Sequence, residues 1–508
     1  MAPQPAAALP QDVLAEVLRR LAPLVLAASR RVCRAWRDTV DARLRRHLLS
    51  RSVRGIFINF TGHDFSEFFS RPSTGPTICG GLDFLPTKGV KVTDHCNGLL
   101  LCGDRERDYV VNPATRQWAR LPQRPPPHMP GFSQSAYLAF DPAVSPHYEV
   151  FLIPRLPDPD KSDDKALLES EWPPALYVLH VFSSTAGQWG EKTFLREGEA
   201  AGIVGDMDFD PWYHLYHAVY WRSTLYIHCQ HGYLTRMSLS DHTYKVIELP
   251  APDEMRGNDY HLGRSLRGVY CAKHNYCNML QLWHLDESHH QTEWVFNYDI
   301  DLSTLERRFH NYRKRFGVDS TQQIGKPWIL QDVNNRKIRE EYHNGRYRPP
   351  VEEKYDWNSD EDNFLYIEDV VEGVYYSGSS HFLGFHPYKE IVYFELHRGR
   401  GVAYDWNSSK FQDLGCSEPT DNHYFEEGTT VSFPYTPCWM GEFPGNEFES
   451  LLEEEEIARK KSELEAQLED HSNFSCADEY ELRKFSGRAK RDKNSVTKLR
   501  RRRRITAR

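Results

Sequence analysis

Apolar residues recur every three to four positions through most of the first fifty residues. The first series comprises Leu9, Val13, Val17 and Leu21, with Leu14 and Leu18 beside it. This spacing predicts a helix, and Pro10 suits its first turn, where the missing N–H costs nothing. Pro23 interrupts the pattern, so we expect a second short helix over residues 24–31. A third helix would carry Val32, Cys33, Trp36 and Val40.

Three helices of this size are too small to bury all of these side chains. Exposed leucine, valine and tryptophan would remain, and large exposed apolar patches usually mark interfaces. Basic residues that would steer the surface toward an acidic partner are Arg19, Arg20, Arg30, Arg31 and Arg34. We therefore predict a docking module. The alternative is that its apolar residues pack against the next domain.

From about residue 53 the pattern changes to short runs rich in Val, Ile, Tyr, Phe and Trp, separated by turn residues. Such runs occupy residues 98–102, 109–111, 117–121, 137–140, 148–153, 176–182, 217–221, 225–229, 234–239, 244–249, 268–271, 280–285, 294–298, 382–385, 391–396 and 402–406. Many short strands at regular spacing predict an all-β body.

A loose repeat sharpens this prediction. Residues 112–122, 240–250 and 405–415 each begin with a polar turn, continue through an aromatic strand and end in Leu-Pro or Leu-Gly. The repeat length of about forty residues is typical of propeller blades. We predict a β-propeller of six blades over residues 53–440, in which residues 53–60 supply the closing strand.

Three stretches interrupt this rhythm. Residues 157–174 are acidic and rich in proline, which predicts a loop. Residues 302–363 are highly charged and are interpreted as a partly disordered insert. Residues 445–470 predict an acidic, solvated helix, because their apolar edge is too thin for a coiled coil. Residues 1–8 and 471–508 are expected to be disordered.

Charge separates the tail from the rest of the chain. The net charge is −9, yet residues 483–508 carry thirteen Lys and Arg and one Asp, so the body is strongly acidic. No apolar run is long enough to span a membrane, and the first residues lack the features of a signal peptide. The ten cysteines form no CxxC pair, which indicates free thiols and a reducing compartment. We expect the protein in the nucleus, the cytoplasm or both.

The basic tail has several interpretations. A nuclear-import signal is favoured, and its candidate residues are Lys490, Arg491, Lys498, Arg500, Arg501, Arg502, Arg503 and Arg504. Attraction to nucleic-acid phosphates is less favoured, and nucleic acid is not expected as a partner. A solvated, disordered end is the remaining alternative.

Catalytic and metal-binding patterns are weak. His228, Cys229 and His231 lie close in sequence, as do His284, His289 and His290. Strand alternation would place His228 and Cys229 on opposite faces, where they cannot share an ion. The chain has no nucleophile elbow, P-loop or dinucleotide fingerprint. We predict no catalytic residue, no metal ligand and no cofactor.

The stretch from Leu9 to Asp38 resembles an F-box. The matching positions are Leu9, Pro10, Asp12, Val17, Leu18, Leu21, Leu26, Val32, Cys33, Trp36 and Arg37. Val13 stands where leucine is commoner, and Ala28-Ser29 replaces a more usual basic or bulky pair. The resemblance implies an F-box over residues 9–50.

The body resembles the F-box-associated domain of plant, especially grass, F-box proteins. The phrases that carry this resemblance include HCNGLLLC, YVVNPATRQWARLP, YLAFDPAVSPHYEVF, LGFHPYKEIVYF and FPYTPCWM. They occur in the same order and fall within residues 94–440. The insert and the basic tail are not covered.

The resemblance implies a non-catalytic substrate receptor of a Skp–cullin–F-box ubiquitin ligase. The F-box would dock on a Skp-type adaptor, and through it a cullin, while the β body binds an unknown protein substrate. The implied adaptor contacts are Leu9, Pro10, Val13, Leu26, Val32, Cys33 and Trp36. The alternatives are a non-ligase scaffold that uses the F-box and tail, and a sugar-binding or catalytic propeller.

Overall fold

The structure is a computed structural model of the 508-residue chain. It describes residues 10–444 except 72–77, 88, 104–106, 130, 158–163, 208–216, 230–231, 251–258, 276–277, 289–291, 308–327, 332–379, 397–398, 418, 420–427 and 442. The predicted N-terminal segment 1–8, the acidic helix 445–470 and the basic tail 471–508 lie outside these residues. Within them, no helix has the length and apolar character needed to cross a bilayer.

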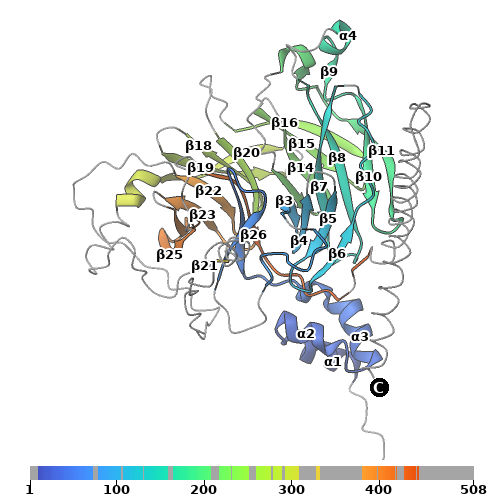
Figure 1. Ribbon diagram of the computed structural model, residues 1–508, viewed down its shortest axis with the longest axis vertical. Coiled ribbons are helices and arrows are strands. Elements are labelled where there is room, and N and C mark those ends of the chain that lie inside the picture. Colours follow the sequence, from blue (N-terminus) through green and yellow to red (C-terminus); the bar gives the residue numbers. More distant parts are fainter. Residues whose placement is uncertain are drawn as a thin grey trace, which may run out of the picture. The chain divides into compact units, whose positions relative to one another are not determined.

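A small helical region comes first (Figure 1). Its elements are α1 (Gln11–Arg19), α2 (Pro23–Ser29), α3 (Arg34–Thr39), a π-helical turn (Val40–Leu44) and a 3₁₀ turn (Arg45–Leu48). Pro10 directly precedes α1, and Pro23 is the first residue of α2, where a missing N–H breaks no helical hydrogen bond. The two prolines therefore set where these helices begin.

Among the described residues, the strands then form six four-stranded antiparallel units, which we call blades 1 to 6. Four of them are separate sheets, and blades 2 and 3 together form one eight-stranded sheet. Blade 1 contains β3 (Lys91–Cys96), β4 (Leu99–Gly103), β5 (Asp108–Asn112) and β6 (Gln117–Arg120). Blade 2 contains β7 (Ser133–Phe140), β8 (Tyr148–Arg155), β10 (Leu176–Ser183) and β11 (Gln188–Arg196). Blade 3 contains β13 (Ala218–Trp221), β14 (Thr224–Cys229), β15 (Tyr233–Ser238) and β16 (Thr243–Glu248). A short parallel pairing of β11 with β16 joins blades 2 and 3.

The other three blades complete the set. Blade 4 contains β17 (Asp259–Ser265), β18 (Gly268–His274), β19 (Met279–Asp286) and β20 (Glu293–Asp301). Blade 5 contains β22 (His381–Phe385), β23 (Ile391–Leu396), β24 (Arg400–Asp405) and β25 (Lys410–Cys416). Blade 6 combines β26 (Thr429–Tyr435) with β1 (Gly55–Phe60), β2 (Ser66–Ser70) and β21 (Ile329–Leu330).

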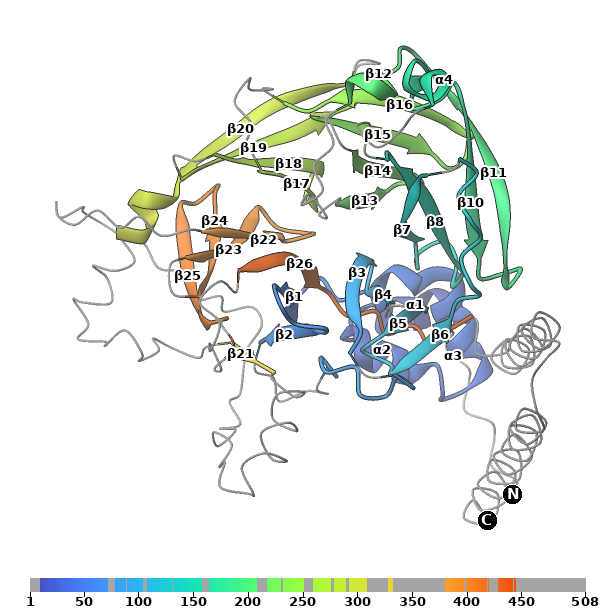
Figure 2. The same cartoon turned by 45° about the horizontal axis from the view of Figure 1, so that its top comes forward.

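The blades form a closed ring (Figure 2). The innermost strands contact one another in the order β3, β7, β13, β17, β22, β26 and back to β3. Closure comes from blade 6, where β1 from the start of the chain pairs with β26 from near residue 435. The predictions of an all-β propeller with six blades, and of a closing strand within residues 53–60, are confirmed.

A layer of apolar side chains fills each gap between neighbouring blades. In β1, Phe57 faces the layer shared with blade 1, while Ile56 and Ile58 face the layer shared with blade 5. Because both faces of each sheet are covered, strands such as β1 and β23 are buried along their whole length. This explains why they appear in the sequence as continuous apolar runs rather than alternating ones.

The repeated endings noted in the sequence are the turn and outer strand of a blade. The residue before the outer strand has positive φ in four blades, namely Arg116, Gly187, His242 and Ser409. Asn112 and Asp405 shape two of these turns by accepting backbone N–H groups two and three residues ahead. Polar residues at these positions therefore reverse the chain without help from the core.

Part of the charged insert predicted at residues 302–363 belongs to the propeller. Within it, β21 pairs with β2 as the outer strand of blade 6. Trp328 is buried, and its ring lies 5.5 Å from that of Phe69. A short apolar run within a charged stretch thus completes a blade.

Connections between antiparallel strands alternate between the two faces of the ring. Turns 97–98, 141–147 and 184–187 lie on one face, where Asn97 Nδ2 donates to the Phe140 carbonyl and the Tyr148 amide donates to Ser184 Oγ. Blades 1 and 2 share an apolar cluster with the helical region. The longer connections of blade 2 lie on the other face, with α4 (Lys165–Leu168), β9 (Glu171–Trp172), β12 (Gly202–Ile203) and a 3₁₀ turn (Val204–Asp206). Figure 1 shows α1–α3 and α4 at opposite ends.

Candidate adaptor-binding surface

The helical region has a core of its own that continues into the propeller. The fully or almost fully buried side chains are Leu14, Leu18, Leu26, Val40, Leu44 and Leu48. On α1 the buried residues are Leu14, Ala15 and Leu18. The residues one position before the two leucines, Val13 and Val17, face solvent instead.

Four valines of the helical region remain exposed. The exposed fractions are 46% for Val13, 49% for Val17, 50% for Val25 and 63% for Val32. Val13 and Val17 are one helical turn apart, so they share one face of α1. We call these four residues the valine surface.

The predicted adaptor contacts divide into three groups. Pro10, Val13, Val32 and Cys33 are exposed, and Leu9 lies outside the described residues. Leu26 has no exposed surface because its side chain belongs to the core, and its role as an adaptor contact stays a prediction. Trp36 is half-buried and packs against that core rather than standing free. Val17 and Val25 were not among the predicted contacts.

Ion pairs stiffen the helical region. Arg30 forms a fork with Asp41, with Nε–Oδ1 at 2.8 Å and Nη2–Oδ2 at 2.9 Å, and only 12% of the Arg30 side chain is exposed. Arg30 is therefore an internal brace and not a rim charge, contrary to its prediction. Arg19 and Arg20 both pair with Glu16, so only part of their charge is open to a partner.

The segment after β26, residues 436–444, passes between the helical region and blades 1 and 2, and we call it the strap. The amide of Ser50 donates to the Pro437 carbonyl at 3.0 Å, and the amide of Trp439 donates to the Leu48 carbonyl at 3.0 Å. On the propeller side, Asn112 Nδ2 donates to the Cys438 carbonyl at 3.0 Å. The strap thus binds both regions at once.

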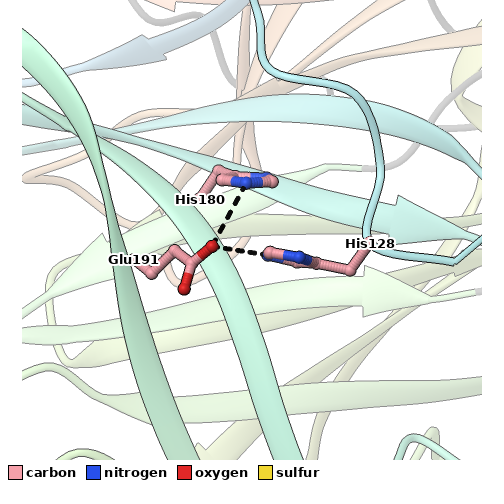
Figure 3. A group of neighbouring side chains, drawn as sticks. All are labelled: His128, His180 and Glu191. Carbon is pink, nitrogen blue, oxygen red and sulfur yellow. Dashed lines mark ion pairs between the residues drawn. The ribbon is translucent and has the colours of Figure 1, made fainter.

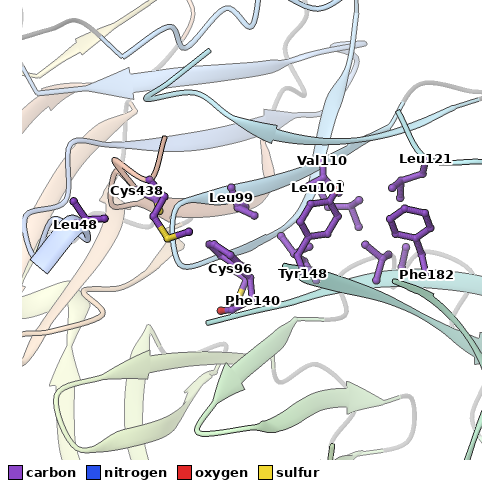
Figure 4. Packing of buried hydrophobic residues seen from close by; sticks show 14 of the residues in the cluster. Leu48, Cys96, Leu99, Leu101, Val110, Leu121, Phe140, Tyr148, Phe182 and Cys438 are labelled. Carbon is purple, nitrogen blue, oxygen red and sulfur yellow. Dashed lines mark hydrogen bonds between the residues drawn. The ribbon is translucent and has the colours of Figure 1, made fainter. Parts of the chain in front are cut away.

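The strap requires a glycine beneath it. Gly98 has φ +88°, and a Cβ there would lie 2.5 Å from Cys438 Cβ and 2.6 Å from its backbone nitrogen. Only glycine fits this turn of the HCNGLLLC segment. Figure 4 shows the result, in which Cys438 lies between Leu48 of the helical region and Leu99 of blade 1.

A polar cavity lies among the innermost strands at the centre of the ring. Its lining includes Asp94, His95, His217, His261 and Arg264. Burial raises the pKa of Asp94 to about 7 and lowers the pKa of both His95 and His217 to about 4. These histidines are therefore neutral near pH 7.

Internal hydrogen bonds occupy much of this lining. Asp94 accepts the Leu138 amide at 2.7 Å, and Arg264 donates to Asn97 Oδ1 at 2.9 Å. The cavity has a volume of about 80 Å³, which holds a few water molecules.

His228 and Cys229 lie on opposite faces of β14. Cys229 packs with the apolar layer between blades 2 and 3, while the ring of His228 lies 6.3 Å from that of Tyr260 in blade 4. The expected opposite faces are observed. His231, His289 and His290 lie outside the described residues. The eight described cysteines are all free thiols.

Comparison with protein families identifies the helical region. Residues 7–48 match the F-box domain. An F-box domain implies binding to a Skp-type adaptor.

Two similar proteins are named as F-box proteins. The F-box protein At5g07610 of Arabidopsis thaliana is 24% identical over 330 residues, covering 59% of this chain and 71% of that protein. The putative F-box/kelch-repeat protein At1g15680 of the same plant is 25% identical over 205 residues, covering 36% of this chain and 46% of that protein. The chain is thus similar to plant F-box proteins.

Solved structures give weaker similarities. YCF48 from Cyanidioschyzon merolae has a TM-score of 0.31 at 8% identity, covering 71% of this chain and 85% of that one. The Dos1 propeller has a TM-score of 0.29 at 9% identity, covering 70% and 66% respectively. Such values are too low to define a fold, and the propeller is identified from its strand pairing instead.

Proposed function

We propose that the chain is the substrate-recognition subunit of a Skp–cullin–F-box ubiquitin ligase. The observation that carries the proposal is the valine surface on the F-box, whose four side chains remain exposed while the leucines of the same domain form its core. Exposed apolar side chains with a polar surround are typical of protein interfaces. The valine surface binds the Skp-type adaptor, and the adaptor links the chain to a cullin.

The strap gives this role a geometric basis. It hydrogen-bonds to the F-box through Leu48 and Ser50 and to blade 1 through Asn112. A fixed F-box holds the propeller in one orientation relative to the adaptor. A receptor that must present a bound protein to a distant catalytic partner benefits from such rigidity.

The target binds the propeller face that carries α4 and β9. The opposite face is occupied by the F-box and the strap, and the long connections of blade 2 lie on the open face. Long connections on a rigid scaffold commonly carry binding residues. The ligase chemistry is supplied by the partners.

A co-purification experiment tests the ligase role. The chain is co-expressed with a Skp-type adaptor and a cullin, and we expect all three proteins to elute together. The double variant Val13→Asp/Val17→Asp loses both partners, whereas Leu176→Asp retains them. Leu176 is a matched control because it is 62% exposed and lies on blade 2. Retention of the adaptor by the double variant contradicts the docking surface.

The same experiment separates the ligase from the non-ligase scaffold. In a scaffold, the adaptor co-purifies and the cullin does not. Recovery of adaptor without cullin, under conditions where a known F-box protein recovers both, contradicts the ligase role.

Proximity labelling tests the target-binding face. The F-box-disabled double variant should accumulate labelled targets, because they are bound but not removed. Replacing residues 164–169 by a Gly-Ser linker of equal length should reduce labelling. The same replacement at residues 142–146, on the F-box side, should not. Equal labelling by both chains contradicts the assigned face.

The basic tail is proposed as a nuclear-import signal, on the strength of its charge run at residues 488–504. A fluorescent fusion that lacks residues 488–508 should lose its nuclear signal. Unchanged nuclear signal contradicts import by the tail.

A further inference from the structure

Two histidines and one glutamate meet on the surface of blade 2 (Figure 3). His180 on β10 and Glu191 on β11 are direct register partners, so their side chains leave the sheet on the same face. His128 comes from the segment that leads into β7. Nε2 of each histidine lies 3.8 Å from Glu191 Oε1, and the three potential ligand atoms lie within 4.8 Å of one another.

The geometry points to a binding site for a divalent cation of the zinc class, held by His128, His180 and Glu191. Two imidazoles and one carboxylate form a known three-ligand set for zinc, with a fourth position left for water or another ligand. Zinc–ligand bonds of about 2.0–2.1 Å place tetrahedral ligand atoms roughly 3.3 Å apart. The two 3.8 Å distances to Glu191 Oε1 exceed this separation by about 0.5 Å, and one imidazole ring must also change its orientation before both can bind one ion.

The ring geometry shows which residue moves. The rings of His128 and His180 stack with centroids 4.0 Å apart and an interplanar angle of 16°. A cation must lie in the plane of each ring that binds it, so two parallel rings cannot both reach it. His180 is only 9% exposed and is fixed in the sheet, whereas the His128 side chain is 32% exposed. His128 therefore tilts when the ion binds.

The segment that carries His128 is anchored nearby. Arg124 Nη2 donates to Asp108 Oδ1 at 2.7 Å, and Arg124 Nη1 donates to the Gln134 carbonyl at 3.2 Å. Trp189 Nε1 donates to the Pro122 carbonyl at 3.1 Å. The anchored segment keeps His128 close to the sheet before any ion binds, which lowers the entropy cost of binding.

The site is open to solvent on one side. The Glu191 side chain is 60% exposed, which leaves the open coordination position to solvent. A bound ion would pin residues 121–132 to blade 2.

Zinc titration of the full chain tests the site. The chain is freed of metal with a chelator and titrated with Zn²⁺ alone against a chromophoric competitor. His128→Ala and Glu191→Gln should each weaken the tightest site at least tenfold. His147→Ala is the matched control, because His147 is an exposed histidine of the same blade, in the turn between β7 and β8, and it should bind as the unchanged chain does.

A second measurement tests the coordination. Co²⁺ in place of zinc should give the visible absorption of a four-coordinate site in the unchanged chain and in His147→Ala, and not in the other two variants. Titrations of His128→Ala and Glu191→Gln that match the unchanged chain overturn the proposal. The absence of any zinc binding tight enough to compete also overturns it.

Discussion

The F-box and the propeller differ in how far their large apolar side chains are buried. Of the eleven large apolar side chains that are exposed among the described residues, four lie in the F-box region, although it is by far the shorter part. In the propeller, six layers between the blades bury the apolar residues. The propeller thus buries most of its large apolar residues between its blades, whereas the short F-box region leaves four valines exposed. Substitutions in the propeller core should therefore mainly lower the free energy of unfolding, whereas substitutions of the exposed F-box valines should mainly weaken adaptor binding.

The largest effect on folding is expected from the closing blade. Phe57 is fully buried, stacks on Phe68 at 4.3 Å and meets the edge of Tyr435 at 5.6 Å. Phe57→Ala should lower the free energy of unfolding by about 3–5 kcal/mol, because it leaves a cavity where the ring closes. Chemical denaturation measures this. A loss below about 1 kcal/mol would mean that blade 6 does not close the ring as described.

The next effect is expected beneath the strap. Gly98→Ala forces a side chain into positive φ, which costs about 1–3 kcal/mol, and directs its Cβ into Cys438. The F-box should then melt separately from the propeller in a calorimetric scan. Gly198→Ala is the control, because Gly198 also has positive φ but has no atom within 4 Å of the new Cβ. A single transition in Gly98→Ala would show that the strap does not couple the two regions.

Acid should act mainly on the propeller. Burial lowers the pKa of His95 and His217 to about 4 and that of His228 to about 3. The unfolded chain gains protons below about pH 6.5 while the folded chain does not, so stability falls as pH drops from about 6.5 toward 4. In the middle of that pH range, each of these histidines lowers the free energy of unfolding by about 1.4 kcal/mol for each pH unit of acidification.

Asp94 has the opposite effect on the pH dependence of stability. Its folded-state pKa of about 7 lies above the pKa of an aspartate in the unfolded chain. Its contribution to the free energy of unfolding therefore declines as pH rises from about 4 to 7. His217→Gln should make the free energy of unfolding fall less steeply as pH drops, and Asp94→Asn should make it fall more steeply. Unfolding midpoints measured across this range give both slopes. Identical slopes in all three chains would contradict the buried, neutral state of these groups.

Much of the propeller could be predicted from the sequence, but several of its strands were missed. Strands β2, β11 and β26 were not among the predicted runs. Strands β3 and β17 were also missed, although β4 and β18 beside them were predicted. Both are innermost strands whose side chains line the polar cavity, including Asp94 and Arg264. They therefore lack the apolar pattern that marks other strands. Strand β21 has two residues and lies in a charged stretch, which gives no local signal.

The F-box surface was only partly predictable for a different reason. Adjacent helix positions differ by about 100°, so the spacing that includes Val13 and Val17 is also that of Leu14 and Leu18. Sequence spacing identifies both series but not which one faces the core. The larger leucines are the buried series, and the strap contact between Gly98 and Cys438 joins residues too distant in sequence for any local pattern to reveal.

The adaptor affinity of Val13→Asp/Val17→Asp tests the central claim most directly, and it should have the smallest effect on folding. Both residues are exposed, so the free energy of unfolding should change by no more than about 0.5 kcal/mol. Calorimetric titration with a Skp-type adaptor should show at least a hundredfold weaker binding, or about 2.7 kcal/mol. Unchanged affinity would contradict the claim that these valines dock the adaptor.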